Sequence, residues 1–227
     1  LVIDNSSTRL SVAVATGSAV WHAGAAPVDT SVAFTGIVDF CLSQAGIGLD
    51  DIEGYVLGTG PGSFTGLRMS LSLIKGFHAA LPRPIVALPS YYALARVYAP
   101  LGRRCAFIFD ARRGLIYGAV YRGAVRRGTK NEGRAVSMMK PGLFELNEFL
   151  ERLDEDEYLF AGESWRFADA IRQRFPRAQI IDETVYPRAC DLIPEALYRF
   201  EKGRTIEPRD IIPLYLHPDT CQVRGVK

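Results

Sequence analysis

The sequence predicts an α/β protein in which mixed sheets are flanked by helices. Two observations lead to this fold class. Each half of the chain opens with short apolar strands joined by tight polar turns, at residues 2–23 and 105–121. In each half the strands then alternate with amphipathic helical segments, an order that is typical of a sheet covered by helices. The two halves share this architecture but no recognisable sequence identity.

Composition and charge exclude several classes of protein. The 227 residues are 48% hydrophobic, which is enough for one large domain or two small ones. A net charge of +2 does not indicate a nucleic-acid binder. No apolar run approaches the ~20 residues of a membrane span, and no signal peptide is visible. We therefore expect no membrane partner, and we expect the initiator methionine to precede Leu1, which already lies in an apolar segment.

Cysteine and histidine usage argues against a metal site. The four cysteines are far apart and form no C-x-x-C pair, which indicates buried thiols in a reducing compartment such as the cytoplasm. The three histidines, His22, His78 and His217, lie beyond helical reach of one another. One chain therefore cannot build the paired-histidine site of a metallopeptidase, and we expect neither a metal nor another cofactor.

Three strands open the first half, at residues 2–3, 10–15 and 19–23. In the polar turn after the first strand, Asp4, Ser6 and Ser7 could hold a magnesium–phosphate group. Asp, Asn and Ser also favour such turns without any ligand, so the sequence leaves both interpretations open.

A helix is predicted over residues 28–45, where Thr30 or Ser31 can serve as its N-cap and Gly46 ends it. Apolar residues recur at helical spacing along one face. These residues are Phe34, Ile37, Val38, Cys41 and Ala45.

A glycine-rich turn, residues 58–68, lies between a predicted strand at 53–57 and a predicted helix at 69–81. Glycines allow a neighbouring chain to come close, and the first turn of the helix offers unpaired N–H groups. Gly60, Gly62 and Ser63 are therefore candidates for binding an anion. The spacing excludes the Walker loop and the Gly-x-Gly-x-x-Gly dinucleotide loop, and a packing turn without a ligand is the competing interpretation.

The helix after this turn is apolar on two sides, and such a helix is buried on two sides. One side can pack on the sheet, whereas the other needs a cover that is either a second helix of this chain or a second protein. The first stripe contains Phe64, Leu67, Leu71, Ile74 and His78, and the second contains Met69, Leu73, Phe77 and Ala80.

The second half is more charged than the first, with 22 Lys/Arg and 19 Asp/Glu after residue 100 against 5 and 6 before it. We expect one domain at 1–102 and another at 103–227, with a junction near Pro100. The basic segment 122–134 could touch RNA phosphates or could be a solvated loop. Further predicted elements are helices at 91–98, 143–153, 165–175 and 188–201, strands at 158–161 and 179–181, and an extended tail at 212–216.

Four segments resemble motifs of the TsaB (YeaZ) family. They are DNSS at residues 4–7, GPGSFTGLR at 60–68, DARRGLIY at 110–117 and PLYL at 213–216. Their order matches the family, they are spread over nearly the whole chain, and the two inner segments are specific. Asn5 departs from the pattern, because the family more often has Thr at this position.

The resemblance implies two actin/Hsp70-like (RNase-H-like, ASKHA) domains in a bacterial cytoplasmic protein. It implies a role in making threonylcarbamoyladenosine beside the anticodon of tRNA, through a non-catalytic subunit with only indirect contact to the tRNA. The implied partners are a TsaD-like paralogue that performs the transfer, a TsaE-like ATPase and, when alone, a second copy. The family's paired surface uses the first two helices, so partner binding is expected at Phe34, Val38, Cys41, Met69, Leu73 and Phe77.

The alternative function is an enzyme that acts alone, either an actin-like ATPase or a glycoprotease-like peptidase. Actin-like ATPases carry a second glycine-rich phosphate loop, whereas residues 160–164 here hold one glycine and a carboxylate. With half of the phosphate clamp missing, we expect no tight ATP binding. We expect at most a vestigial phosphate site at Asp4, Ser6, Ser7, Gly60, Gly62 and Ser63.

Overall fold

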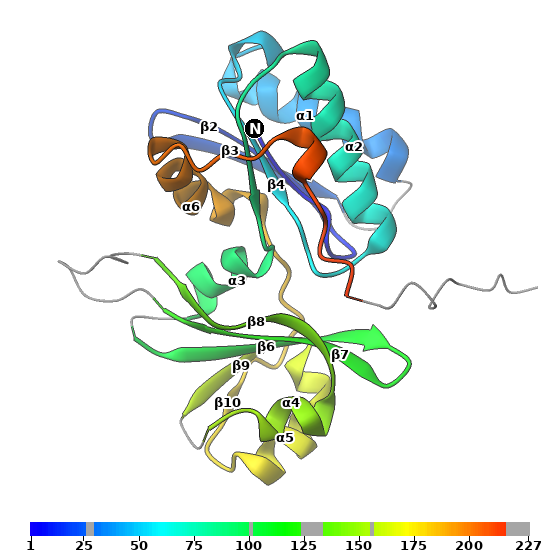
Figure 1. Ribbon diagram of the computed structural model, residues 1–227, viewed down its shortest axis with the longest axis vertical. Coiled ribbons are helices and arrows are strands. Elements are labelled where there is room, and N and C mark those ends of the chain that lie inside the picture. Colours follow the sequence, from blue (N-terminus) through cyan, green and yellow to red (C-terminus); the bar gives the residue numbers. More distant parts are fainter. Residues whose placement is uncertain (26–29, 100–101, 124–133, 155–156, 217–227) are drawn as a thin grey trace, which may run out of the picture.

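A computed structural model describes residues 1–25, 30–99, 102–123, 134–154 and 157–216. It contains two five-stranded mixed sheets flanked by helices, so the predicted α/β fold class is confirmed (Figure 1). In the described ranges no helix is both long enough and apolar enough to cross a membrane. Most of the basic segment 122–134 lies outside the described residues, because residues 124–133 are not described. His217 and Cys221 also lie outside them.

The first sheet has the strand order β3-β2-β1-β4-β5. The three strands predicted at the start of the chain form an antiparallel meander. Strand β4 then pairs in parallel with β1, and β5 pairs in parallel with β4. The strands are β1 (Val2–Asp4), β2 (Leu10–Thr16), β3 (Ala19–Ala25), β4 (Tyr55–Gly58) and β5 (Ile85–Leu88).

Helices cover both faces of this first sheet. On one face lie α1 (Thr30–Ala45) and α2 (Phe64–Ala80), which share a core cluster with Ile3, Leu10 and Val12 of the sheet. On the other face lies α6 (Ala189–Glu201). Its Leu192 belongs to a core cluster with Val2 and Ala13, strand residues that point to this face of the sheet. Because successive side chains of a strand point to opposite faces of the sheet, the residues that contact α1 and α2 differ from those that contact α6.

The second sheet has the order β10-β9-β6-β7-β8 and stands below the first in Figure 1. Helices α4 (Leu146–Glu151) and α5 (Ala168–Arg174) pack on one face, and α3 (Tyr91–Tyr98) packs on the other, between the two sheets. The strands are β6 (Arg104–Arg112), β7 (Leu115–Arg122), β8 (Val136–Glu145), β9 (Tyr158–Gly162) and β10 (Gln179–Ile180). Short 3-10 helices occur at Leu49–Asp51, Ser164–Phe167 and Pro208–Asp210.

Two expectations need correction. Residues 143–145 were expected to begin a helix but end strand β8, because this stretch completes an antiparallel ladder with β7. Strand β8 itself was not predicted, since Pro141 and Gly142 interrupt any alternating pattern. Pro194 was expected to kink the last helix or to set its first turn; it lies inside α6 beyond the first turn, so the second alternative is wrong and the kink stays a prediction.

The division at residue 102 stays a prediction. The strands of the two sheets do lie on either side of that position in the chain. However, α6 comes from the second half of the chain and packs on the first sheet, so the polypeptide crosses back between the two units.

Glycine is required where α2 begins, and a pair of substitutions in this helix tests the close contact. A Cβ atom at Gly66 would lie 2.1 Å from the backbone oxygen of Asn5, whereas a Cβ at Gly76 would meet nothing within 4 Å. We expect Gly66→Ala to lower the free energy of unfolding by about 3 kcal/mol, because neither backbone can yield. Gly76→Ala should raise it by about 1 kcal/mol through helix propensity. Urea unfolding of both variants measures these changes, and equal stabilities would contradict the packing described.

Candidate functional site

The glycine-rich turn packs directly against the turn that follows β1. The backbone N–H of Ser63 donates to the carbonyl oxygen of Ser6 at 2.7 Å. A Cβ at Gly62 would lie 1.8 Å from that same oxygen, and the residue has φ 154°. The Ser63 hydroxyl accepts from the N–H of Gly66 at 3.2 Å and so caps α2. The two turns therefore need glycine for contact with each other.

Asp4 is the most deeply buried of the candidate site residues, with no exposed surface. Its Oδ1 accepts from the Ser6 N–H at 3.0 Å and from the Ser6 hydroxyl at 2.7 Å. Its Oδ2 is buried without a hydrogen bond of ordinary geometry, although the Ser90 hydroxyl lies close by. Burial raises the pKa of Asp4, and the nearby hydroxyls of Ser90 and Ser6 only partly oppose that rise.

The structure brings most of the expected phosphate-site residues together. However, two backbone donors of the site are engaged within the chain, since Gly60 N–H donates to Ser90 Oγ at 3.0 Å and Ser63 N–H donates to Ser6. Ser7 points elsewhere, because its hydroxyl is exposed and bonds the backbone of Arg9. Packing alone accounts for these contacts, and phosphate binding at this turn stays a prediction.

A groove lies between α1 and α2 on the solvent side of the first sheet. Its volume is about 660 Å³. The lining combines apolar, hydroxyl and cationic side chains, and most of the exposed ones come from the first three turns of α2. The residues are Phe34, Thr35, Phe64, Thr65, Arg68, Met69, Ser72 and Leu73.

One of the groove residues, Phe64, belongs to an aromatic pair with Tyr215. Phe64, at the start of α2, is 55% exposed and lies 4.9 Å from the ring of Tyr215, which is 42% exposed. The guanidinium of Arg68 lies 5.2 Å from the Phe64 ring centroid. The tail reaches this position because Leu214 N–H donates to Thr59 O at 2.9 Å.

The expected partner-binding residues of α1 are buried in this structure, and their role in binding stays a prediction. Phe34, Val38 and Cys41 are only 4%, 2% and 1% exposed, because they are the face that α1 turns to its own sheet. Val38 and Cys41 lie outside the groove, whereas Phe34 reaches its lining. In an amphipathic helix the apolar stripe covers the core of its own chain first.

The expected residues of α2 divide between two environments. Met69 and Leu73 are partly buried against the core and also line the groove. Phe77 packs on the core and lies 6.1 Å from the ring of Tyr55, away from the groove lining. Sequence reasoning missed Arg68, Ser72 and Tyr215 as groove-side residues. The helical spacing of the polar residues Arg68 and Ser72 could have indicated that these two lie on the exposed side of α2. Nothing in the sequence could have indicated Tyr215, because 151 residues separate it from Phe64.

The described histidines serve structural contacts. His22 Nε2 lies 2.8 Å from Ser11 Oγ, and His78 Nδ1 lies 2.9 Å from the carbonyl oxygen of Arg83. Among the residues that the structure describes, no three His, Cys, Asp or Glu side chains are grouped so as to hold a metal ion.

Comparison with known proteins agrees with this architecture. The sequence model of the family described as TsaD: tRNA N6-adenosine threonylcarbamoyltransferase matches residues 26–198. The chain belongs to this family. Within the TsaD family it is 26% identical over 222 residues to the tRNA threonylcarbamoyladenosine biosynthesis protein TsaB of Escherichia coli, covering 95% of this chain and 93% of that protein. The protein of the same name from Bacillus subtilis is 35% identical over 80 residues, which is 35% of each chain.

Solved structures extend the likeness to the whole fold. YeaZ from Pseudomonas aeruginosa matches with a TM-score of 0.78 and 25% identity, covering 94% of this chain and 97% of that one. A second structure, of an uncharacterised protein with similarity to peptidase YEAZ from the same organism, has a TM-score of 0.80, 24% identity and coverage of 95% and 97%. The expected place of the chain among TsaB (YeaZ) proteins of the TsaD family is confirmed.

The buried carboxyl group of Asp4 predicts a pH dependence of stability. Because its pKa is raised in the folded state, the folded protein holds this proton more tightly than the unfolded chain. The resulting stabilisation is present below the unfolded pKa, near the ordinary value of 3.8, and is lost as pH rises through the folded pKa. Asp4→Asn should therefore gain stability relative to wild type as pH rises above about 4. Urea unfolding of both proteins over a pH series measures this, and a constant difference would contradict it.

Proposed function

We propose that this chain takes part in the synthesis of threonylcarbamoyladenosine on tRNA in the bacterial cytoplasm. In this proposal it is a non-catalytic subunit that binds a TsaD-like paralogue, with a TsaE-like ATPase joining the pair. Support comes from two TsaB relatives, which are named for threonylcarbamoyladenosine biosynthesis and align over 95% and 79% of the chain.

The observation that carries the binding role is the groove between α1 and α2. It exposes Phe64 beside Tyr215, with Met69 and Leu73 along its floor and Arg68 at its edge. Exposed apolar surface rimmed by polar groups marks interaction sites, and aromatic and Arg side chains are the usual energetic anchors of interfaces. A partner that presents a helix pair of the same fold could cover this surface, and so could a second copy when the paralogue is absent.

The non-catalytic role is supported by how the glycine-rich turn is used. Its donors at Gly60 and Ser63 bond to Ser90 and Ser6, and Gly62 packs against the Ser6 carbonyl. A turn whose Gly60 and Ser63 N–H groups are already bonded within the chain has fewer donors left to stabilise a transferring phosphoryl group.

Substitution of Phe64 tests the groove as the binding surface. Phe64→Glu places a charge at an exposed position, so the fold should be retained while the charge must be desolvated in the complex. We expect affinity for a TsaD-like protein to fall by about 2 kcal/mol, or roughly thirtyfold, as measured by calorimetry. Ser72→Glu, also exposed on the groove, should weaken binding in the same way.

Met138→Glu is the matched control, because Met138 is 48% exposed on β8 and lies outside the groove lining. It should leave affinity unchanged. Full binding by both groove variants, or equal loss in the control, would show that the paralogue docks elsewhere.

The enzymatic alternative predicts turnover by the lone chain. We expect the purified full chain to hydrolyse neither ATP nor peptide substrates above the rate of a buffer blank, because the turn beside Asp4 uses its Gly60 and Ser63 N–H groups within the chain. Measured turnover that Asp4→Ala abolishes would favour the actin-like ATPase or the peptidase. Turnover that survives this change would indicate a contaminating enzyme.

A further inference from the structure

A second surface gathers positive charge on the opposite face of the first sheet from the groove. It surrounds Tyr198 on the last turns of α6, and the charges come from α3, from the start of β8 and from the end of α6. We call it the Tyr198 surface. Its cations are Arg96, Arg134, Arg199, Lys202 and Arg204.

The aromatic ring of Tyr198 is the centre of this surface. The guanidinium of Arg134 lies 3.9 Å from its centroid, that of Arg204 lies 5.8 Å away, and the Lys202 ammonium lies 5.9 Å away. Three cations on one ring would repel one another in the absence of an anion. An attraction to the π face offsets only part of that repulsion.

Part of this charge is neutralised within the protein and part is not. Glu195, which is buried, accepts from Arg134 at 2.6 Å twice and from Arg199 at 3.0 Å. Lys202 and Arg204 are exposed and have no carboxylate partner among the described residues. Arg96 is likewise exposed and lines the same small hollow as Arg134 and Glu195.

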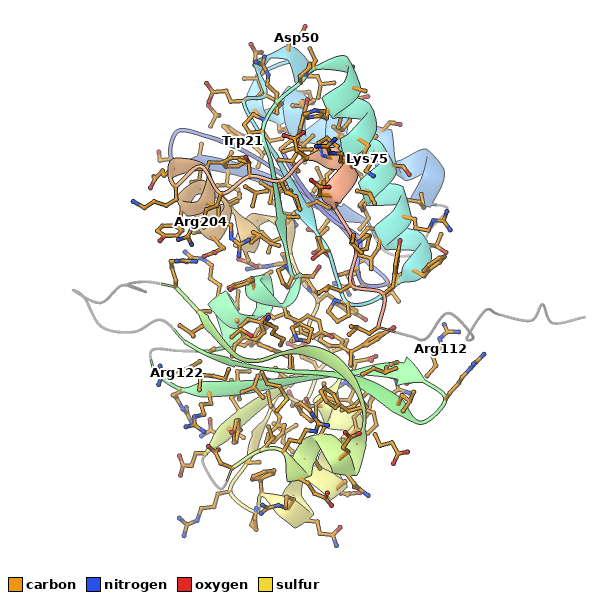
Figure 2. The ribbon with its side chains drawn as sticks, in the orientation of Figure 1. Trp21, Asp50, Lys75, Arg112, Arg122 and Arg204 are labelled. Atoms are coloured by element: carbon orange, nitrogen blue, oxygen red, sulfur yellow. The ribbon has the colours of Figure 1, made fainter. Side chains whose placement is uncertain are left out.

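The Tyr198 surface differs in chemistry from the groove between α1 and α2. Its exposed groups are mainly the cations Arg96, Lys202 and Arg204, which suits contact with phosphates. Figure 2 shows Arg204 on the side of the molecule that carries α6, away from Lys75 on α2. A ligand on this surface would therefore leave the groove accessible to a protein partner.

We infer that the Tyr198 surface binds the phosphate backbone of RNA directly, with Lys202, Arg204 and Arg96 as the cations that meet phosphates. Arg134, held by Glu195, lies over the Tyr198 ring, while Arg199 donates to the same carboxylate and lies near the Tyr92 ring. This inference rests on the proposed function for the identity of the RNA as tRNA, and it replaces the expectation of purely indirect contact with tRNA.

The test measures binding of a fluorescently labelled tRNA transcript to the full chain by anisotropy over a series of salt concentrations. Wild-type affinity should fall linearly on a log–log plot against salt, because each phosphate contact releases counterions. Lys202→Gln with Arg204→Gln should lower affinity about tenfold at low salt and reduce the slope by about 1 to 2. Arg96→Gln should act in the same direction and more weakly.

The matched control removes two cations from the end of another helix. Arg172→Gln with Arg174→Gln changes the last turn of α5, which packs on the second sheet, and lowers net charge by the same amount. We expect this variant to bind tRNA as the wild type does. Equal weakening by both double variants would mean that net charge alone attracts RNA, and this would overturn the inference.

Two further results would also overturn it. One is a wild-type chain that does not bind tRNA at low salt. The other is that Lys202→Gln with Arg204→Gln keeps full tRNA affinity but no longer binds a TsaE-like or TsaD-like protein. The Tyr198 surface would then bind an acidic protein instead of RNA. Binding of the TsaD-like protein, measured on the same samples, tests the proposed function separately, and its failure leaves the tRNA result to decide this inference.

Discussion

The contact between two turns, at the carboxyl end of β1 and at the start of α2, is the constraint on which the rest of the first unit depends. Backbone meets backbone there, with Ser63 N–H on the Ser6 carbonyl and with Gly62 and Gly66 lacking the Cβ atoms that would collide. Such a contact leaves no freedom to shift, because no flexible side chain lies between the chains. The position and direction of α2 follow from it.

Fixing α2 in this way determines what the first sheet can present to other molecules. Its Leu67 and Ile74 are committed to the core, so the first turns expose Phe64, Arg68 and Ser72 along the groove beside α1. Hydrogen bonds within the chain also occupy the Gly60, Ser63 and Gly66 N–H groups, which reduces the donors that this turn could offer to an anion. One packing solution thus favours a docking surface and disfavours phosphate chemistry.

The return of α6 to the first sheet divides the molecule's surface by chemistry. An apolar groove lies over one face of the sheet, and a cationic surface with Tyr198 at its centre lies over the other. The alternation of side chains along β1 and β2 keeps these faces separate, since each strand contributes to both cores. The proposed protein partner and the proposed RNA would therefore meet opposite faces of the first sheet.

The sequence by itself determined the fold class, most strands and helices, and the family, because hydrophobic period and the glycine-rich motif are local signals. It also indicated that α2 has two apolar sides. It could not show that Val38 and Cys41 face the chain's own sheet, since a stripe that faces that sheet looks the same as one that faces a partner. Strand β8 was hidden by Pro141 and Gly142.

Only the tertiary structure decided which surfaces are open and which residues meet. The pairing of Phe64 with Tyr215 and the gathering of Arg134 and Arg204 around Tyr198 join segments far apart in the chain. Spacing rules describe neighbours within one helix or strand, whereas these contacts arise from how whole elements pack. For that reason the docking groove could be anticipated in outline, while the Phe64–Tyr215 pair and the basic surface could not.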